Sequence, residues 1–475
     1  KNYINGQFIK PESNEYVKCY TPHNEKQYAL CPRSNKADLN LAIKSSKKAF
    51  KLWSKLDRMA RADYLFKISD LIKKDLNMLA KAESKDTGKP LDLAKKLDIP
   101  RSIDNIKFFA SAIANFSSDS YNNESNSLHY TLKQPLGIVG CISPWNLPLY
   151  LFTWKIAPAL ITGNCVIAKP SEITPMTAYL FAKICIKAKL PAGVLNIIHG
   201  LGSEIGEKIV LDKNIKAISF TGSTETGKII AKKTASQLKK VSLELGGKNP
   251  VIIFSDCNYK KMMKTIIQSS FLNQGQICLA GSRILIEKKI YNRFKKDFVN
   301  ATRNITIGKP SENFDLGPVV SKEHYHKIIY YIEKAKNDKN NILIGKKNLI
   351  QKKQKGWYIY PTIIEGASIN SSINQEEIFG PVVTIMPFNS EEEALKFANN
   401  SHYGLASVVW TENLTKAQRI SQSIESGIVW INNWLVRDLR TPFGGMKDSG
   451  VGREGGTDAL NFFTEKKSVC IDYNE

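Results

Sequence analysis

The sequence predicts an α/β protein with two α/β domains, and three observations carry that prediction. The chain has 475 residues, which is too long for a single hydrophobic core. From about residue 135 onward, short apolar runs of strand length end at Gly, Pro or Ser and alternate with segments of helical periodicity. This alternation is typical of a parallel sheet covered by helices on both faces. Because new strands of the same kind appear after residue 260, a second α/β domain is expected.

The first part of the chain predicts a small antiparallel edge followed by helices. Residues 3–31 alternate in polarity and contain the hairpin signal Asn5-Gly6. Between residues 36 and 115 the apolar residues recur at helical spacing, which predicts three or four helices. The polar stretch 117–127 is expected to form a loop.

Buried strands are expected in two groups. The first group is SLHYTLKQPLGIVGCISPW, GNCVIAKPS, GVLNIIHG, IKAISFTGS and KVSLELGGKNPVIIF, and the second is SRILIE, GPVVTIMPF, ASVVWT and GIVWINN. Residues 337–356 are low in complexity and are expected to form a solvated loop or hairpin.

Composition and charge narrow the class of protein. No window approaches eighteen consecutive apolar residues, so no membrane span is expected. The net charge of +24 invites a nucleic-acid-binding interpretation. Lysines spread over the whole chain supply most of this charge, however, and no cluster of arginines flanked by aromatic residues accompanies them. The charge therefore favours a general positive field, and no nucleic-acid partner is expected.

The cysteines and histidines predict neither disulfides nor a metal site. The eight cysteines are scattered, without a CxxC pair or a Cys/His cluster at zinc spacing. His324 and His326 form a close pair, but no third ligand accompanies them. The first residues, KNYINGQFIKPES, contain no apolar signal core. A reducing, cytoplasmic location is expected.

Cys278 is the candidate nucleophile. It follows the turn residues Gly275 and Gln276 and precedes small residues, so its side chain is expected at the mouth of a helix with room for a substrate. A helix N-terminus or a nearby cation lowers the pKa of a thiol and favours covalent catalysis. A buried, inert cysteine is the more common alternative for an isolated residue of this type. The motifs elsewhere in the chain favour the nucleophile.

Seven short stretches resemble, in order and in spacing, the motifs of the aldehyde dehydrogenase superfamily. They are PWNLP (144–148), KPSE (169–172), FTGSTETG (220–227), LELGGKNP (243–250), NQGQICLAGS (273–282), EEIFGPV (376–382) and PFGGMKDSGVGRE (442–454). The resemblance covers nearly the whole chain, so it predicts an enzyme that oxidises an aldehyde with NAD.

The same resemblance implies a domain organisation. Residues 1–114 and 135–246 are expected to form a Rossmann-like NAD-binding domain, and residues 247–448 a catalytic domain. Residues 115–134 and 462–475 would form a β arm for oligomerisation, and residues 449–461 would return the chain to the first domain. A homodimer or a homotetramer is expected.

Three residues are carried over from the family as catalytic. Cys278 would add to the aldehyde, and Glu244, at the end of a buried strand, would act as the general base with a raised pKa. The side-chain amide of Asn146 would donate to the oxygen of the adduct together with the backbone N–H of Cys278. Glu454 matches an acidic residue credited with relaying protons, and Lys155 and Gly247 are expected to support the site.

The resemblance also implies the cofactor residues. As in the family, the pyrophosphate would meet the helix start at Gly222 and Ser223; the GxGxxG-like run at 200–206 has one extra residue and is weak evidence. Lys169 and Glu172 would bind the adenosine ribose, and an acid at that position favours NAD over NADP. Glu377 and Phe379 would hold the nicotinamide ribose and ring, and Trp145 is also expected among the cofactor-binding residues.

Two arginines are expected to select the substrate. The runs 99–111 and 434–445 resemble the branch of 2-aminomuconate and 2-hydroxymuconate semialdehyde dehydrogenases, which implies that Arg101 and Arg437 bind a distal carboxylate. Arg440 is less favoured, because it stands next to Thr441-Pro442 and is expected to face solvent. Trp434 and Phe108 would line the apolar part of the site or belong to the core.

Other interpretations remain open at the level of sequence. A betaine-aldehyde or succinic-semialdehyde dehydrogenase is one alternative, although two arginines would repel a cationic substrate. A non-catalytic scaffold or a basic binding protein is another, and the intact set of Cys278, Glu244 and Asn146 argues against it.

Overall fold

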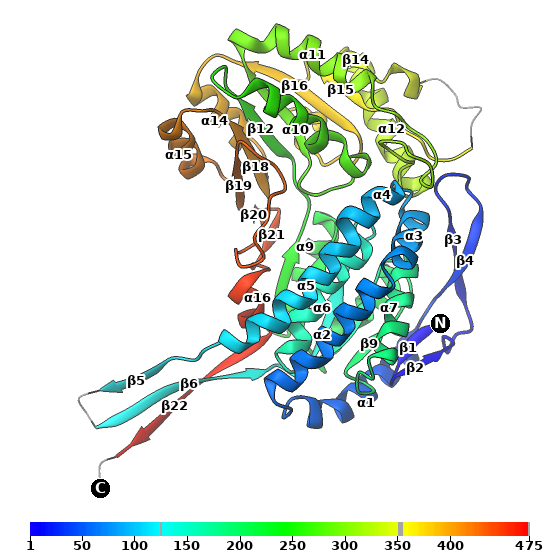
Figure 1. Ribbon diagram of the computed structural model, residues 1–475, viewed down its shortest axis with the longest axis vertical. Coiled ribbons are helices and arrows are strands. Elements are labelled where there is room, and N and C mark those ends of the chain that lie inside the picture. The colour runs from blue at the N-terminus through cyan, green and yellow to red at the C-terminus, as the bar shows by residue number, and fades with distance from the viewer. Residues whose placement is uncertain (124–125, 350–354, 474–475) are drawn as a thin grey trace.

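The computed structural model describes residues 1–123, 126–349 and 355–473, and Figure 1 shows its parts. Two sheets, each covered by helices, lie one above the other, and a thin β arm projects away from the lower one. Residues 124–125 and 474–475 of the expected arm, and residues 350–354 of the expected loop, lie outside the described residues.

The lower sheet has eight strands. Its central five are parallel, whereas β1, β2 and β21 join antiparallel at the edges. The order across the sheet is β2 (Gln7–Ile9), β1 (Asn2–Ile4), β9 (Leu195–Ile197), β8 (Cys165–Lys169), β7 (Ile138–Ile142), β10 (Ile215–Thr221), β11 (Lys240–Glu244) and β21 (Gly450–Val451). Parallel register aligns Thr221 with Glu244 and Ile142 with Lys169, so these residues end their strands at one edge of the sheet.

Helices cover both faces of this sheet, as the sequence predicts. One apolar core contains residues of α2 (Arg58–Lys74), α3 (Leu76–Thr87), α5 (Ile99–Ala112), α6 (Pro148–Ile161) and α7 (Met176–Lys187). The core on the other face contains residues of α1 (Lys36–Trp53), α8 (Glu207–Leu211) and α9 (Thr224–Ala235). Every residue of α6 is buried, so this helix lies inside the core of the lower part of the molecule.

The upper sheet has seven strands, and all its pairings are parallel except that of β14 with β15. The order is β14 (Asn341–Ile344), β15 (Thr362–Glu365), β16 (Val382–Phe388), β13 (Gly281–Glu287), β12 (Asn249–Ile253), β18 (Ala406–Trp410) and β19 (Ile428–Ile431). Its helices are α10 (Tyr259–Phe271), α11 (Tyr291–Arg303), α12 (Lys322–Asn337), α13 (Ser372–Gln375), α14 (Glu391–Asn399) and α15 (Leu414–Ser423).

Short elements complete the described parts of the chain. They are β3 (Tyr16–Tyr20) paired with β4 (Gln27–Pro32), β17 (Tyr403–Gly404) paired with β20 (Met446–Lys447), α4 (Leu91–Leu93), α16 (Gly456–Phe462) and six single turns, η1 (Ala94–Asp98), η2 (Ile113–Asn115), η3 (Gly202–Gly206), η4 (Leu272–Gly275), η5 (Lys288–Ile290) and η6 (Lys346–Leu349). The predicted hairpin at Asn5-Gly6 is confirmed, because both residues have positive φ and connect β1 to β2.

The arm is a three-stranded antiparallel sheet. Its middle strand β6 (Ser127–Pro135) pairs along nine residues with β22 (Thr464–Asp472) and, on its other side, with β5 (Ser120–Asn123). The prediction of a loop over 117–127 is therefore wrong for β5. A strand that stands clear of the main body needs no alternation of apolar residues, and so its polar sequence did not reveal it.

No helix in residues 1–123, 126–349 and 355–473 is both long and apolar enough to cross a membrane.

Candidate active site

Cys278 lies in the loop between η4 and β13, where the two sheets meet. The prediction that it stands at the mouth of a helix is wrong, because α10 ends seven residues before it and a strand follows it. The loop is tightly turned: Asn273 and Gln274 have φ of 53° and 57°. A Cβ at Gly275 would lie 2.2 Å from the carbonyl oxygen of Gly380, so this turn requires glycine.

Hydrogen bonds from several segments hold the cysteine loop. The amide of Asn249 donates to the carbonyl of Cys278 over 2.7 Å, and the indole N–H of Trp434 donates to the carbonyl of Leu279 over 2.9 Å. The backbone N–H of Val320 donates to the side-chain oxygen of Gln276 over 3.0 Å. The position of the thiol is thus fixed by neighbours that are distant in sequence.

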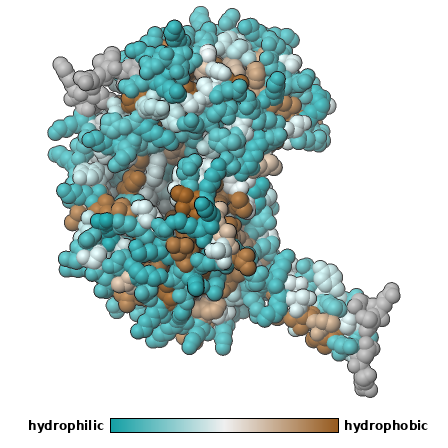
Figure 2. Space-filling view, turned by 180° about the vertical axis from the view of Figure 1, so that it is seen from behind, coloured by the Kyte–Doolittle hydropathy of each residue, from teal (hydrophilic) through white to brown (hydrophobic). Residues whose placement is uncertain are grey.

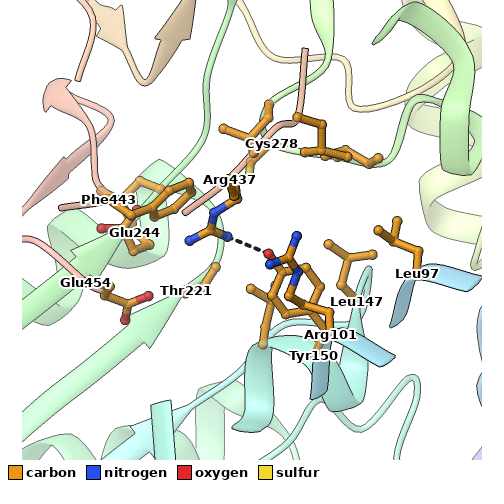
Figure 3. Close-up of a pocket in the computed structure, with 15 residues that line it drawn as sticks. Leu97, Arg101, Leu147, Tyr150, Thr221, Glu244, Cys278, Arg437, Phe443 and Glu454 are labelled. Atoms are coloured by element: carbon orange, nitrogen blue, oxygen red, sulfur yellow. Dashed lines mark hydrogen bonds between the residues drawn. The ribbon is translucent and has the colours of Figure 1, made fainter. Parts of the chain in front are cut away.

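Two pockets meet at Cys278. The first, here called the waist pocket, has a cavity of about 230 Å³ and is lined by Trp145, Asn146, Gly222, Ser223, Cys278, His324, Glu377 and Phe379 among others. The second, here called the arginine pocket, is lined by Arg101, Tyr150, Glu244, Cys278, Arg437, Phe443 and Glu454 among others (Figure 3). Thr221 lines both, and its buried hydroxyl has no hydrogen-bond partner.

The thiol of Cys278 is protonated at neutral pH in this arrangement. Burial raises its pKa to about 12, and the carboxyl groups of Glu377 and Glu244 add to the rise while Arg437 opposes it. This differs from the expectation of a lowered pKa, because no helix N-terminus points at the sulfur. A base must therefore take the proton before or during attack.

Glu244 is the candidate for that base. It ends β11 and is buried, and neither of its carboxylate oxygens has a hydrogen-bond partner. Burial raises its pKa well above the usual range, and Glu454 adds to the rise. The direction is the one predicted for a carboxylate at a buried strand end. A Cβ at residue 444 would lie 2.8 Å from Glu244 Oε1, so Gly444 leaves space beside the acid.

Asn146 stands on the other side of the thiol. Its side-chain amide donates to the carbonyl of Gln276, 3.0 Å away and two residues before the cysteine. Its own carbonyl accepts from Lys89 Nζ at 3.0 Å, and Lys89 forms an ion pair with Asp98 in which both side chains are fully buried. The segment that carries Asn146 is thus attached to a buried charge pair, which the sequence did not indicate.

A second buried ion pair lies below Glu244. Lys155 Nζ lies 2.7 Å from Glu454 Oε1, and the hydroxyl of Ser219 donates to the same oxygen over 3.1 Å. Lys155 on α6 and Glu454 in the segment before α16 are thereby joined. This arrangement fits the supporting role expected for Lys155 and keeps the Glu454 carboxylate on the wall of the arginine pocket.

The residues expected at the nicotinamide end lie together in the waist pocket. The rings of Trp145 and Phe379 are 5.3 Å apart, and His324 Nε2 lies 2.7 Å from the carbonyl of Phe379. Phe379 has φ of 62°, a strained conformation for a bulky residue. Glu377 accepts from the backbone N–H of Gly247 at 2.9 Å, which places Gly247 beside the site as expected.

The residues expected at the adenosine ribose lie at and just after the end of β8, and those expected at the pyrophosphate follow the end of β10. Lys169 Nζ lies 2.8 Å from Glu172 Oε2, and the backbone N–H of Gly202 donates to the other oxygen of Glu172 over 3.2 Å. Burial alone would raise the pKa of Glu172, but Lys169 holds it below the usual value. Ser223 caps α9, and Gly222 precedes it.

Arg101 and Arg437 converge on the arginine pocket from opposite sides, as Figure 3 shows. Neither forms an ion pair within the described residues. The guanidinium carbon of Arg437 lies 4.0 Å from the ring centre of Phe443 and 4.9 Å from that of Trp154. Two positive charges therefore face one pocket; of the two acids on its wall, Glu454 is paired with Lys155, and the carboxylate oxygens of Glu244 have no hydrogen-bond partner.

Other aromatic and charged candidates lie elsewhere. Arg440 is exposed and pairs with Asp438 over 2.6 Å, as its position before Thr441-Pro442 suggested. Phe108 lines a separate surface groove with Arg440. Trp434 is buried against the cysteine loop and does not line either pocket. Tyr150, which the sequence analysis missed, lies between the two arginines; its only signal was a polar tip within the otherwise apolar first turn of α6.

Comparisons with known proteins agree with this geometry. The family model described as the aldehyde dehydrogenase family matches residues 8–469. The 2-aminomuconic semialdehyde dehydrogenase of Bos taurus is 45% identical over 100% of this chain and 98% of its own, and the 2-hydroxymuconic semialdehyde dehydrogenase of Pseudomonas sp. (strain CF600) is 38% identical over 99% of both. The solved structure of an aldehyde dehydrogenase from Bacillus cereus in complex with NAD⁺ is 36% identical, with a TM-score of 0.97, and the match covers 100% of this chain and 96% of that one. The chain belongs to the aldehyde dehydrogenase family.

Proposed function

We propose that the protein oxidises a carboxylate-bearing semialdehyde to the dicarboxylate with NAD, through a covalent adduct on Cys278. The preferred substrates in this proposal are 2-aminomuconate and 2-hydroxymuconate 6-semialdehyde. The observation that carries the substrate class is the pair of arginines, Arg101 and Arg437, that share one pocket with the thiol and form no ion pair within the described residues, although Glu244 and Glu454 line the same pocket. The names of the curated relatives support the same class.

The residues present fit NAD. The waist pocket adjoins the thiol, the start of α9 supplies free backbone N–H groups for a phosphate, and Lys169 and Glu172 offer a donor and an acceptor for a ribose. Trp145, Glu377 and Phe379 would hold the nicotinamide end. Bound NAD supplies the acceptor for the hydride. An acid at position 172 would repel a 2′-phosphate, which supports NAD over NADP.

The chain's own residues account for the covalent chemistry. Glu244, with its raised pKa, accepts the thiol proton, and the sulfur of Cys278 adds to the aldehyde carbon. The amide of Asn146 stabilises the resulting oxyanion. Glu244 then releases the thiol proton to solvent. After the adduct has been oxidised to the thioester, the ionised Glu244 takes a proton from the water that attacks the thioester carbon, the carboxylate leaves, and the sulfur of Cys278 regains a proton.

The alternatives differ in the charge of the substrate. Betaine aldehyde carries a positive charge, which the two arginines disfavour. Succinic semialdehyde carries a carboxylate but has a shorter chain, so its carboxylate would reach less far from Cys278. A scaffold without activity is not favoured. Cys278 lines both pockets, Glu244 lines the arginine pocket beside it, and Asn146 lines the waist pocket.

Paired probes of equal length test the substrate class. We expect 6-oxohexanoate to be a better substrate than hexanal, measured as kcat/KM for NADH formation. Arg101→Met or Arg437→Met should remove this preference by raising KM for 6-oxohexanoate about 10- to 100-fold, because a hydrogen bond to a charged group contributes about 1.5–3 kcal/mol. Arg440→Met, at an exposed arginine outside the pocket, is the matched control. Equal activity on both probes in the unaltered enzyme would refute the proposed substrate class.

We also propose the assembly, organisation and location of the protein. The arm carries exposed apolar residues, Tyr121, Leu132, Ile471 and Tyr473, and Figure 2 shows it standing clear of the body. These exposed residues support a homodimer or a homotetramer joined through the arm. Within one chain, the proposed organisation takes residues 1–114 and 135–246 as the NAD-binding domain, residues 247–448 as the catalytic domain and residues 449–461 as the return segment. A free catalytic thiol supports a reducing compartment such as the cytoplasm. Light scattering coupled to size-exclusion chromatography tests the assembly.

A further inference from the structure

Tyr150 occupies the space between the two arginines of the arginine pocket (Figure 3). It belongs to the first turn of α6 and is buried. Its carbonyl accepts from Asn105 Nδ2 and from the hydroxyl of Thr153, each at 3.0 Å. Because the backbone is held on both sides, the direction of the phenol ring is fixed before any substrate enters.

The hydrogen bond to Arg437 sets the role of the phenol oxygen. Arg437 Nη1 donates to this oxygen over 2.5 Å, so the oxygen acts as acceptor there. The hydroxyl proton must then point away from Arg437. Within the described residues, no group is recorded as accepting this proton. An O–H donor in a pocket wall, already polarised by a cation, is directed toward whatever fills the pocket.

Arg437 itself is held in place. The rings of Phe443 and Trp154 lie beside its guanidinium group, and the indole N–H of Trp430 donates to the carbonyl of Val436 over 2.8 Å. On the other side, the guanidinium carbon of Arg101 lies 6.0 Å from the centre of the Tyr150 ring. The phenol therefore joins two cationic groups that come from separate segments of the chain.

We propose that Tyr150 is a specificity-determining residue, whose hydroxyl donates the third hydrogen bond, beside Arg101 and Arg437, to the distal carboxylate of the substrate. This inference rests on the proposed function and deepens it. A carboxylate accepts up to about four hydrogen bonds, so two guanidinium groups and one hydroxyl can bind it together. The hydroxyl adds selection for an anionic acceptor, since a neutral aldehyde of the same length has no oxygen to receive the proton.

Packing alone does not require the hydroxyl. The neighbours of the ring in the pocket include Leu97, Leu147 and Leu151, which contact a phenyl ring equally well. A phenylalanine at this position would fill the same volume and keep the core of α6. The substitution Tyr150→Phe therefore isolates the hydroxyl from the ring.

The test compares Tyr150→Phe with the unaltered enzyme on 6-oxohexanoate and hexanal. We expect KM for 6-oxohexanoate to rise about tenfold with little change in kcat, and the kinetics on hexanal to stay unchanged. The inhibition constant of adipate, measured against hexanal, should rise by a similar factor, because adipate presents the same carboxylate without an aldehyde. Tyr330→Phe, which removes the hydroxyl of an exposed tyrosine on α12, is the matched control.

The outcomes separate this inference from the proposed function. If the unaltered enzyme does not prefer 6-oxohexanoate, the proposed substrate class fails. If the preference exists and Arg437→Met removes it, but Tyr150→Phe keeps both KM and the adipate constant, only the role of Tyr150 is overturned. Equal losses on both aldehydes with an unchanged adipate constant would assign Tyr150 a structural role and also overturn the inference.

Discussion

Replacing Glu244 by glutamine should lower the catalytic rate and, at the same time, make the protein relatively more stable as pH rises. The carboxylate is buried, neither of its oxygens has a hydrogen-bond partner, and its pKa is raised well above the usual range by burial and by Glu454. Glutamine has nearly the same shape but no charge. The variant should lose about 10²- to 10⁴-fold in kcat, the usual contribution of a positioned general base.

The effect on stability follows from the direction of the pKa shift. Because the native pKa of Glu244 is raised, the native state holds this proton at pH values where the unfolded chain, with a pKa of about 4.3, has released it. The stability contributed by the protonated group is therefore present below about pH 4 and is lost as pH rises toward the native pKa. The loss has a ceiling of about 1.4 kcal/mol per pH unit. Glu244→Gln is free of this term, so its stability relative to the unaltered protein should increase from pH 5 to pH 8.

Two measurements check this reasoning. Thermal unfolding midpoints of both proteins at pH 5 and pH 8 give the sign of the relative stability, and initial rates of NADH formation between pH 5 and pH 9 give the activity. For the unaltered enzyme, the acid limb of kcat should lie well above the usual range of a glutamate, since the carboxylate must be ionised to act. A variant that keeps its rate, or that becomes less stable relative to the parent as pH rises, would refute the assignment.

Three further results are expected. Cys278→Ala should abolish NADH formation while NAD binding, measured by calorimetry, is retained; turnover above background would remove the nucleophile assignment. Asp98→Asn removes the carboxylate paired with the fully buried Lys89 and leaves the neighbouring buried carboxyl of Glu83 beside it, so it should destabilise the protein by up to about 3–5 kcal/mol, visible in denaturant unfolding, and an unchanged unfolding curve would contradict this. Glu172→Gln should raise KM for NAD several-fold and narrow the preference over NADP, because the ribose loses a charged acceptor; an unchanged ratio of kcat/KM for the two cofactors would exclude this role.

Much of the architecture was predictable because buried elements carry their pattern in the sequence. The apolar strands β7 and β8 are buried along their length and β10 along most of it, and their boundaries at Gly, Pro and Ser are visible in the chain. The rise in the pKa of Glu244 was predictable too, because a carboxylate that ends such a strand must be poorly solvated. The family resemblance then related these elements to chemistry.

Other features were not predictable, because they depend on contacts between distant segments. The environment of Cys278 was misjudged, since the turn after Gly275 leads into a strand and acidic groups approach the sulfur from other segments. The partnership of Lys89 with Asn146 joins residues 57 positions apart, and no local pattern marks it. The strand β5 is polar, and its residues Ser120, Tyr121 and Asn122 are exposed, so it differs little in composition from a loop.

Two glycines that lie against the carboxylates of Glu377 and Glu244 limit which substitutions the active site tolerates. A Cβ at Gly246 would lie 2.4 Å from Glu377 Oε2, just as one at Gly444 would approach Glu244 Oε1. A single added methyl group at either position would force a carboxylate to rotate, although no charge, hydrogen-bond donor or substrate contact had changed. The tolerance of this enzyme to substitution therefore depends partly on the space beside these carboxylates. Even Gly246→Ala or Gly444→Ala, although small changes, should strongly reduce turnover.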